Sequence, residues 1–230
     1  MVAEGIESVD ALDALDASRE TQTDETGQTL SKRKQKHDEL RRRIFEAALD
    51  LFRRQGVAKT TIRQIAQAAH VGVGTFFNYF ADKEAVLTEV GAIQAERVAQ
   101  LLEEPEFQAQ TTRERIEALL GMLVSSAEAE PELARGMARA ALRSRSIFDE
   151  RRQLLFTFAT ALTNILREGQ ACGEVNPACD AAAAAQMIAI TYAMLILEWA
   201  TSPNERELFP TLLTYIKALW VGLAPPQVTT

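Results

Sequence analysis

Residues 70–86, HVGVGTFFNYFADKEAV, hold the densest group of side chains with possible chemistry. Gly72 and Gly74 precede four aromatic residues, and Lys83 follows them. A Gly-x-Gly pair could cradle a phosphate, but a dinucleotide-binding loop follows a strand, and no strand pattern precedes these glycines. Two roles remain for this stretch, which are packing in a core and contact with another molecule.

Few other residues could support catalysis or bind a metal. The chain has two cysteines, Cys172 and Cys179, and two histidines. Neither histidine lies near a cysteine in the sequence. The spacing of the cysteines matches no metal motif, and no Ser/His/Asp arrangement is present. We therefore expect no catalytic residue, metal or cofactor, and two thiols in a reducing compartment. An enzyme is the disfavoured alternative.

Basic residues concentrate in one part of this acidic chain of 230 residues, whose net charge is −7. Residues 1–30 carry a net charge of −7 and residues 91–230 carry −5. Residues 31–90 carry +5, from twelve basic and seven acidic side chains. A positive block of this kind favours a region that binds a polyanion such as DNA.

The elements that must position these residues all have the apolar spacing of helices. No alternating strand pattern and no internal repeat is present. Gly56 is expected to end the first helix, Thr60 or Thr61 to cap the second, and Asp82 to cap the fourth. The sequence predicts an all-α protein with about nine helices, at 38–55, 61–69, 72–79, 82–104, 111–129, 131–143, 147–171, 180–201 and 204–223.

Composition predicts four parts in the chain. Residues 1–36, acidic and then basic, are expected to form a disordered tail. Residues 37–84 hold three short helices with one apolar face each and a brief turn before the last, the layout of a helix-turn-helix. Residues 85–224 form a larger helical domain, and 225–230 a short tail.

Residues 181–200, AAAAAQMIAITYAMLILEWA, are long and apolar enough to span a membrane. The segment is rich in alanine, contains Gln186 and Thr191, and has no lysine or arginine immediately at either end. A helix that is apolar on nearly all sides can equally be buried among other helices. We expect burial, no membrane partner and a cytoplasmic protein.

The segment RRRIFEAALDLFRRQGVAKTTIRQIAQAAHVGVGTFFNYFADKEAVLTEV resembles the TetR family of bacterial transcriptional repressors. The matching order is a helix ending in Phe-x-x-x-Gly, then Thr-Thr-Ile-x-x-Ile-Ala, Val-x-x-Gly-Thr-aromatic, and Tyr-Phe-x-x-Lys-Glu. The later helices fit by length and pattern alone. The resemblance implies an N-terminal DNA-binding domain and a larger helical domain that dimerises and binds a small ligand.

The resemblance also implies roles for single residues at the DNA. Thr61 would cap the second helix and bond a phosphate, and Gly74 would permit close backbone approach to the duplex. Tyr79 and Lys83 would contact phosphates, the lysine from the start of a helix. The complete set implied is Arg42, Thr60, Thr61, Arg63, Val73, Gly74, Thr75, Phe77, Asn78, Tyr79 and Lys83.

Three positions depart from the family pattern. Phe77 and Val73 stand where tyrosine and lysine are frequent, and His70 replaces a common glycine. The recognition helix is therefore poor in charge, so the basic residues of 31–36 and 41–43 are expected to add affinity through counterion release. Phe76 and Phe80 are expected to face the core, whereas core and DNA remain open for Phe77, and solvent and DNA for Arg63.

The resemblance places dimerisation in the last two helices, two from each subunit. The predicted interface is Ile188, Tyr192, Leu195, Trp199, Leu212, Ile216 and Leu219. A ligand is expected among helices 111–129, 131–143, 147–171 and 180–201. Its candidate wall is Met122, Met137, Phe156, Phe158, Met187 and Met194, with simple core packing as the alternative.

These expectations combine into a dimeric repressor that binds a palindromic DNA operator and is released by a small, apolar effector. The two recognition helices would meet successive major grooves about 34–36 Å apart. The alternatives are a DNA-binding regulator of the same fold without an effector, and an activator.

Overall fold

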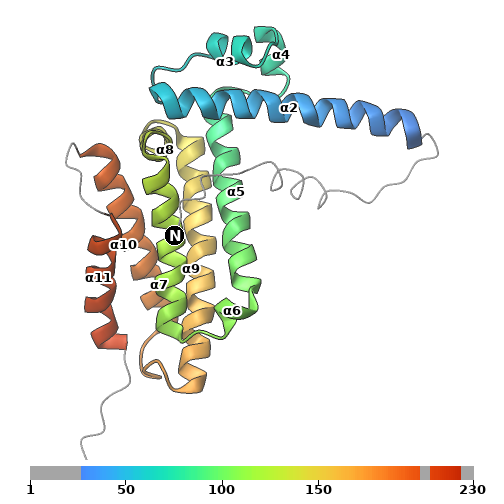
Figure 1. Cartoon of the computed structure of the whole chain (residues 1–230). Coiled ribbons are helices and arrows are strands. Elements are labelled where there is room, and N and C mark those ends of the chain that lie inside the picture. The colour runs from blue at the N-terminus through green and yellow to red at the C-terminus, as the bar shows by residue number, and fades with distance from the viewer. Residues whose placement is uncertain (1–26, 203–207, 224–230) are drawn as a thin grey trace, which may run out of the picture. The chain divides into compact units, whose positions relative to one another are not determined.

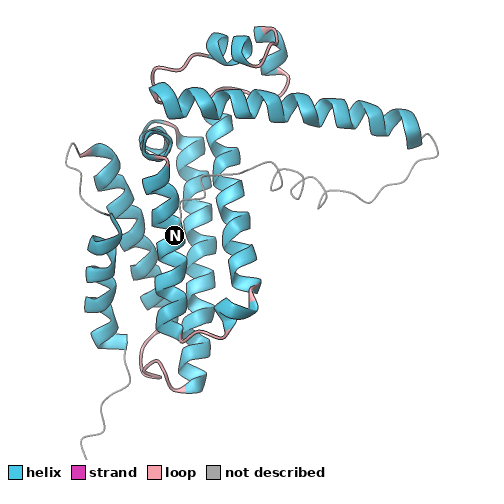
Figure 2. Cartoon of the chain, viewed as in Figure 1, coloured by secondary structure: helices cyan, strands magenta, loops and turns pink. Residues whose placement is uncertain are grey.

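The computed structural model describes residues 27–202 and 208–223, and every regular element within them is a helix (Figure 2). This confirms the all-α prediction, with ten helices described where about nine were expected. The additional helix, α6, is a single turn that begins at Pro105, a residue favoured at the first helical position. The helices are α2 (Gly27–Gln55), α3 (Ile62–Ala68), α4 (Val73–Phe77), α5 (Glu84–Glu103), α6 (Pro105–Gln108), α7 (Thr112–Ala129), α8 (Pro131–Arg143), α9 (Arg145–Cys172), α10 (Ala181–Thr201) and α11 (Leu208–Leu223).

Helix α2 begins well before the predicted position. It includes residues 27–36, for which the composition predicted a disordered tail. Lysine, arginine and glutamine are good helix formers and no proline interrupts them, so the helix continues through the basic residues. Gly56 ends α2 as expected, because it has a φ of 79° and its N–H donates to the Phe52 carbonyl over 2.9 Å. The predicted tails at 1–26 and 225–230 lie outside the described residues.

Local side-chain caps start the next helices as predicted. Thr61 accepts a hydrogen bond from the Gln64 backbone N–H, and the Gln64 side chain accepts one from the Thr61 N–H over 2.9 Å. This reciprocal pair satisfies two donors that α3 itself leaves unbonded. At α5, the Asp82 carboxylate accepts from the Ala85 N–H over 2.7 Å, which confirms the predicted cap.

The chain forms two compact units, and the boundary falls within α5 and α8. The first unit contains the residues up to Glu96 together with Glu130–Met137. The second contains Arg97–Ala129 and the residues from Ala138 onward. The first unit therefore extends beyond the predicted helix-turn-helix domain, since the start of α5 and half of α8 pack with it.

Half of helix α8 is joined to α2 inside the first unit. Arg53 of α2 donates to the Glu130 carboxylate over 2.8 Å just before α8 begins. Six residues further along the chain, Gly136 lies so close to Val57 that a Cβ at this position would overlap the valine side chain. Burial of the large side chains holds the rest of this unit: Ile44, Phe45, Leu49, Phe52, Ile65, Phe76 and Val90.

In the second unit, α7, α9, α10 and α11 pack alongside one another (Figure 1). Helix α10 is long and apolar enough to cross a membrane by length and composition, a test that the core helix of a globular domain also passes. Here it packs against α9 and α11. Its buried positions, among them Ala185, Ile188 and Leu195, agree with the predicted burial among other helices.

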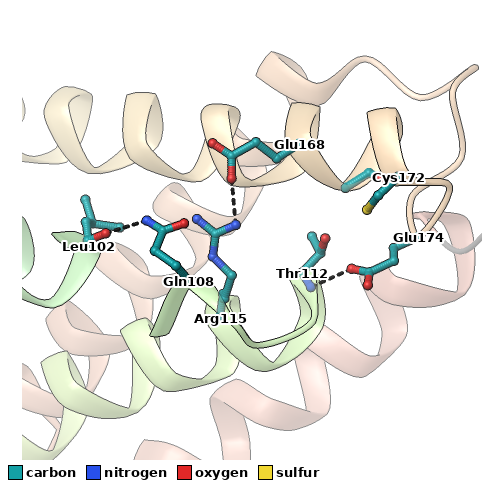
Figure 3. Close-up of polar contacts among 8 residues, drawn as sticks. Leu102, Gln108, Thr112, Arg115, Glu168, Cys172 and Glu174 are labelled. Carbon is teal, nitrogen blue, oxygen red and sulfur yellow. Dashed lines mark hydrogen bonds and ion pairs between the residues drawn. The ribbon is translucent and has the colours of Figure 1, made fainter. Parts of the chain in front are cut away.

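A polar cluster ties α7 to α9 within the same unit (Figure 3). The buried Arg115 donates to Glu168 over 2.6 Å and lies 5.3 Å from the centre of the Phe107 ring. The Thr112 backbone N–H donates to Glu174 over 2.7 Å, and hydrogen bonds from Thr112 lower the pKa of this carboxyl. These contacts join the start of α7 to the end of α9.

Candidate functional site

Helix α4 divides its side chains between the core and the surface. Phe76 and Phe80 are buried, as predicted, and fix the inner face of the helix. Phe77, which the sequence left open, has 51% of its surface exposed and meets Phe76 only edge-on. Val73 is 41% exposed, and Gly74 and Asn78 are exposed as well. The outer face of α4 thus offers a small surface of apolar and amide groups.

Gly74 lies on this exposed surface, and the fold itself does not require a glycine there. Its φ is not in the left-handed region, and a Cβ built on it would meet nothing within 4 Å. A glycine in an exposed helix costs about 0.5–1 kcal/mol relative to alanine. Neither the backbone conformation nor the packing of the fold therefore accounts for a glycine at this position.

Tyr79 has a partner that the sequence did not reveal. Its ring centre lies 4.6 Å from that of His37 on α2, with the ring planes tilted by 39°. The His37 side chain is 57% exposed. Position 37 precedes the recognised motif, so no local pattern pointed to it. The length of α2 places the imidazole of His37 beside the predicted phosphate contact of Tyr79.

Lys83, predicted to contact phosphate, is already engaged within the fold. Its Nζ donates to the Val57 carbonyl over 2.7 Å and to the Thr60 carbonyl over 3.0 Å. The ammonium group thus holds the loop between α2 and α3. It has a third N–H, which could still reach an anion outside.

The remaining DNA candidates fall into two groups. Thr60 is 1% exposed and its hydroxyl donates to the Gly56 carbonyl over 2.9 Å, so it offers no surface to DNA. Arg42, half-buried, pairs with Glu46 one turn later at 2.8 Å. Thr61 and Arg63 are exposed, and Thr75 is half-buried at the start of α4. Only part of the predicted set is therefore exposed to solvent.

His70 explains how a residue other than glycine forms the turn between α3 and α4. It has a φ of 52°, in the left-handed region that favours glycine. Hydrogen bonds from the His70 N–H to Gln67 and from the Val71 N–H to Ala66 close the end of α3. The imidazole is exposed, as the sequence predicted.

The six ligand candidates are not brought together. Phe158 is buried and its ring lies 5.8 Å from that of Tyr192, and Met122 is half-buried. Met137 belongs to the first unit. The other three, Phe156, Met187 and Met194, are more than half exposed and do not line an interior.

The predicted dimer contacts lie on the inner side of their helices. Five of the seven are buried within the chain itself: Ile188, Leu195, Trp199, Leu212 and Ile216. Ile188, at 1% exposure, has no surface left for a partner. Tyr192 and Leu219 are half-buried. The exposed apolar residues on these two helices are instead Met187, Ile190, Met194, Tyr215 and Val221, which we call the outer apolar face.

Comparisons with known proteins agree with this architecture. The family model "Bacterial regulatory proteins, tetR family" matches residues 44–90. The transcriptional regulator AcrR of Shigella flexneri is 33% identical over 93 residues, 40% of this chain and 42% of that protein. The fatty acid metabolism regulator protein of Bacillus subtilis is 25% identical over 184 residues, 78% of this chain and 93% of its own length.

A solved structure extends the likeness over both units. FadR of Thermus thermophilus, a TetR-family transcriptional repressor in complex with lauroyl-CoA, is 29% identical to this chain. The alignment covers 83% of this chain and 98% of that one, with a TM-score of 0.64. These similar proteins are transcriptional regulators and not enzymes. Together with the helix-turn-helix geometry, the comparisons show that residues 44–90 match the TetR family model and that the chain is similar to TetR-family transcriptional regulators along most of its length.

Proposed function

We propose that the protein is a dimeric repressor that binds a palindromic operator through α4 and leaves it when a long-chain acyl compound binds the second unit. The exposed surface of α4, with a glycine that the fold does not need, is the observation that carries the DNA-binding part. A repressor of this kind acts in the cytoplasm, where its operator is.

At the DNA interface, α4 would supply a surface that fits against the duplex, and the basic residues of α2 would supply positive charge. Gly74 lets the duplex approach the backbone, and Asn78 can bond a base edge or a phosphate. Phe77 would contact sugar or a thymine methyl. The helical residues of 31–43 then continue the positive charge along the same unit, and release of counterions adds affinity.

The dimer would form through the outer apolar face of α10 and α11. Met187, Ile190 and Met194 recur at helical spacing and are each about half exposed, at 54%, 47% and 57%. Exposed apolar residues grouped in this way typically mark an interaction site. A two-fold axis through this face would pair it with itself, as a palindromic operator requires.

Helix α8 is the element best suited to couple the two units. Its first half packs in the DNA-binding unit through the Arg53–Glu130 ion pair and the Val57–Gly136 contact. Its second half belongs to the ligand-binding unit. A ligand that favours a different position of α8 would change the affinity for DNA, since effector and operator then select different states of one helix.

An acyl compound is the effector class that the comparisons favour. The Thermus FadR similar to this chain was solved with lauroyl-CoA, and the similar Bacillus protein is named for fatty acid metabolism. Between α9 and α10, Phe158 is buried and its ring lies 5.8 Å from that of Tyr192, an aromatic contact of the kind that an acyl chain could join.

The decisive experiment selects bound sequences from random DNA and then titrates lauroyl-CoA against the selected operator. We expect a palindrome, a protein stoichiometry of two, and a loss of operator affinity of about tenfold or more at saturation. Tyr79→Phe should weaken operator binding while it keeps the ring packed on His37. Thr160→Val, the control, removes an exposed hydroxyl from α9 that bonds only within its own helix, and should leave DNA binding unchanged. Selection of no common sequence would refute the proposed DNA recognition.

A further inference from the structure

Two rings with available polar groups lie side by side in the first unit. The ring of His37 on α2 has its centre 4.6 Å from that of Tyr79, two residues beyond the end of α4. His37 is exposed and Tyr79 is half-buried. Among the described residues, neither the Tyr79 hydroxyl nor His37 Nε2 has a hydrogen-bond partner. A molecule that approaches this surface can therefore bond both groups.

Asp38 determines which nitrogen of His37 carries the proton of a neutral imidazole. His37 Nδ1 lies 3.2 Å from an oxygen of the Asp38 carboxylate. A carboxylate has only acceptors, so this contact places the proton on Nδ1 and leaves a lone pair on Nε2. Only the protonated imidazole, which donates from both nitrogens, can bond Asp38 and an outside anion at the same time.

The charged groups near His37 leave room for an anion at this surface. On α2, Lys34 lies one turn before His37 and Arg41 one turn after it. Arg41 donates to Glu89 of α5 over 2.8 Å, so these two charges offset each other. Residues 73–81, which include α4 and pack against His37 through one ring, carry no charged side chain. Nothing acidic on that segment therefore repels a phosphate.

We propose that His37 is a further phosphate-binding residue of the DNA interface and that it binds in its protonated form. The inference rests on the proposed function, which gives Tyr79 a phosphate contact. The Tyr79 hydroxyl and the Nε2–H of the imidazolium would donate to one backbone phosphate, while Nδ1–H stays bonded to Asp38. DNA binding then takes up a proton at His37, so operator affinity falls as the pH rises through the range in which histidine loses its charge.

The test measures the affinity of the full chain for a labelled operator duplex at about pH 6 and about pH 8. Fluorescence anisotropy at constant salt gives the affinity. Wild-type protein should bind about fivefold or more tightly at the lower pH, because it gains a charge-assisted hydrogen bond. His37→Phe keeps an aromatic ring beside Tyr79 but has no nitrogen. At both pH values it should bind about as weakly as wild type does at the higher pH.

The second histidine of the chain supplies the matched control. His70 is exposed in the turn between α3 and α4 and has a φ of 52°. His70→Asn removes this imidazole and introduces a residue that tolerates a left-handed backbone. It should keep the pH dependence of wild type. Equal pH dependence in wild type and His37→Phe refutes the inference, as does its loss in His70→Asn.

Asp38→Asn tests the assignment of the imidazole proton. The asparagine amide can donate to Nδ1, so a neutral imidazole can keep its proton on Nε2 and still donate to phosphate. The difference in affinity between the two pH values should therefore shrink, through tighter binding at the higher pH. An undiminished difference would refute the assigned role of Asp38 and with it the need for a protonated His37.

A second substitution covers the case in which His37→Phe does not fold, which circular dichroism detects. His37→Gln has an amide donor at every pH and cannot take up a proton. Operator binding by this variant should be independent of pH in the range tested. If it keeps the pH dependence of wild type, another group takes up the proton and the inference fails.

The same measurements separate this inference from the proposed function. A phosphate contact carries no sequence information, so a duplex of random sequence should show the same pH dependence as the operator. Operator binding by wild type that is equally tight at both pH values keeps the DNA-binding repressor and rejects the protonated contact. If wild-type protein binds no duplex at either pH, the inference and the proposed function both fail.

Discussion

Helices α4 and α10 were both recognised in the sequence, yet only α4 could be oriented correctly from it. In α4 the inward positions of Phe76 and Phe80 were predicted and are buried. In α10 the bounds were predicted within one residue, but Ile188 and Leu195 point inward where a partner was expected. The difference shows that predicting where a helix lies in the sequence and predicting which of its faces is buried are two separate problems.

The polarity contrast around each helix accounts for this difference. Glycine and asparagine mark the outer side of α4, which leaves Phe76 on the side that faces the core. Helix α10 is apolar on nearly all sides, and Met187, Ile188 and Ile190 are chemically alike. Which of them is buried depends on where α9 and α11 pack against α10 (Figure 1). The apolar periodicity of α10 alone does not indicate where these neighbours lie.

The largest expected effect comes from charging the two sides of α10 in turn. Ile188→Arg buries an unpaired charge in the core and should cost about 4 kcal/mol or more, enough to unfold the second unit. Ile190→Arg lies on the outer apolar face and should give a folded monomer. Circular dichroism and sedimentation distinguish the two results. Folded monomers from both variants would contradict the inward position of Ile188.

The next effect tests whether Lys83 belongs to the fold or to the DNA interface. Lys83→Met removes two hydrogen bonds to the carbonyls of Val57 and Thr60 and should lower the free energy of unfolding by about 2–3 kcal/mol in urea titrations. Lys59→Met, an exposed lysine of the neighbouring loop, should change stability by less than about 0.5 kcal/mol.

Operator affinity plotted against salt completes the Lys83 experiment. A lysine that also meets phosphate should, when removed, reduce the slope of log affinity against log salt by about 0.9. An unchanged slope with lowered stability would assign Lys83 to the fold alone. A changed slope with unchanged stability would contradict the carbonyl contacts as a source of stability.

A smaller effect is expected from Gly74→Ala, and it should appear in DNA binding rather than in stability. The added methyl meets nothing in the fold, so the free energy of unfolding should stay equal or rise by about 0.5–1 kcal/mol. Operator affinity should fall by about tenfold if the backbone touches the duplex. Gly222→Ala in α11 is the control, since its Cβ also meets nothing within 4 Å. Unchanged operator affinity would remove close backbone approach from the proposal.

The smallest effect concerns the turn that joins α3 and α4. His70→Gly relieves a left-handed backbone conformation and should raise the free energy of unfolding by about 1 kcal/mol. His70→Ala keeps the Cβ and should give no such gain. If His70→Gly and His70→Ala change the free energy of unfolding by the same amount, the loss of the imidazole rather than the backbone conformation determines stability at this turn.

The sequence alone determined the features whose causes are local. The helical period predicted an all-α fold, Gly56 ended α2, and Thr61 and Asp82 capped the helices that follow them. Each of these depends on residues within one turn, so the atoms that cooperate are also neighbours in the chain. The helix-turn-helix was recognisable for the same reason, since its spacing is contained in about 50 consecutive residues.

Only the tertiary structure decided which groups from distant segments meet. Lys83 bonds to carbonyls 26 and 23 residues earlier, His37 packs on Tyr79, and Phe158 of α9 packs on Tyr192 of α10. Nothing in the local sequence of these residues specifies the partner, because the partner is chosen when whole helices pack. The same packing decided which side of α10 became core and which side remained exposed.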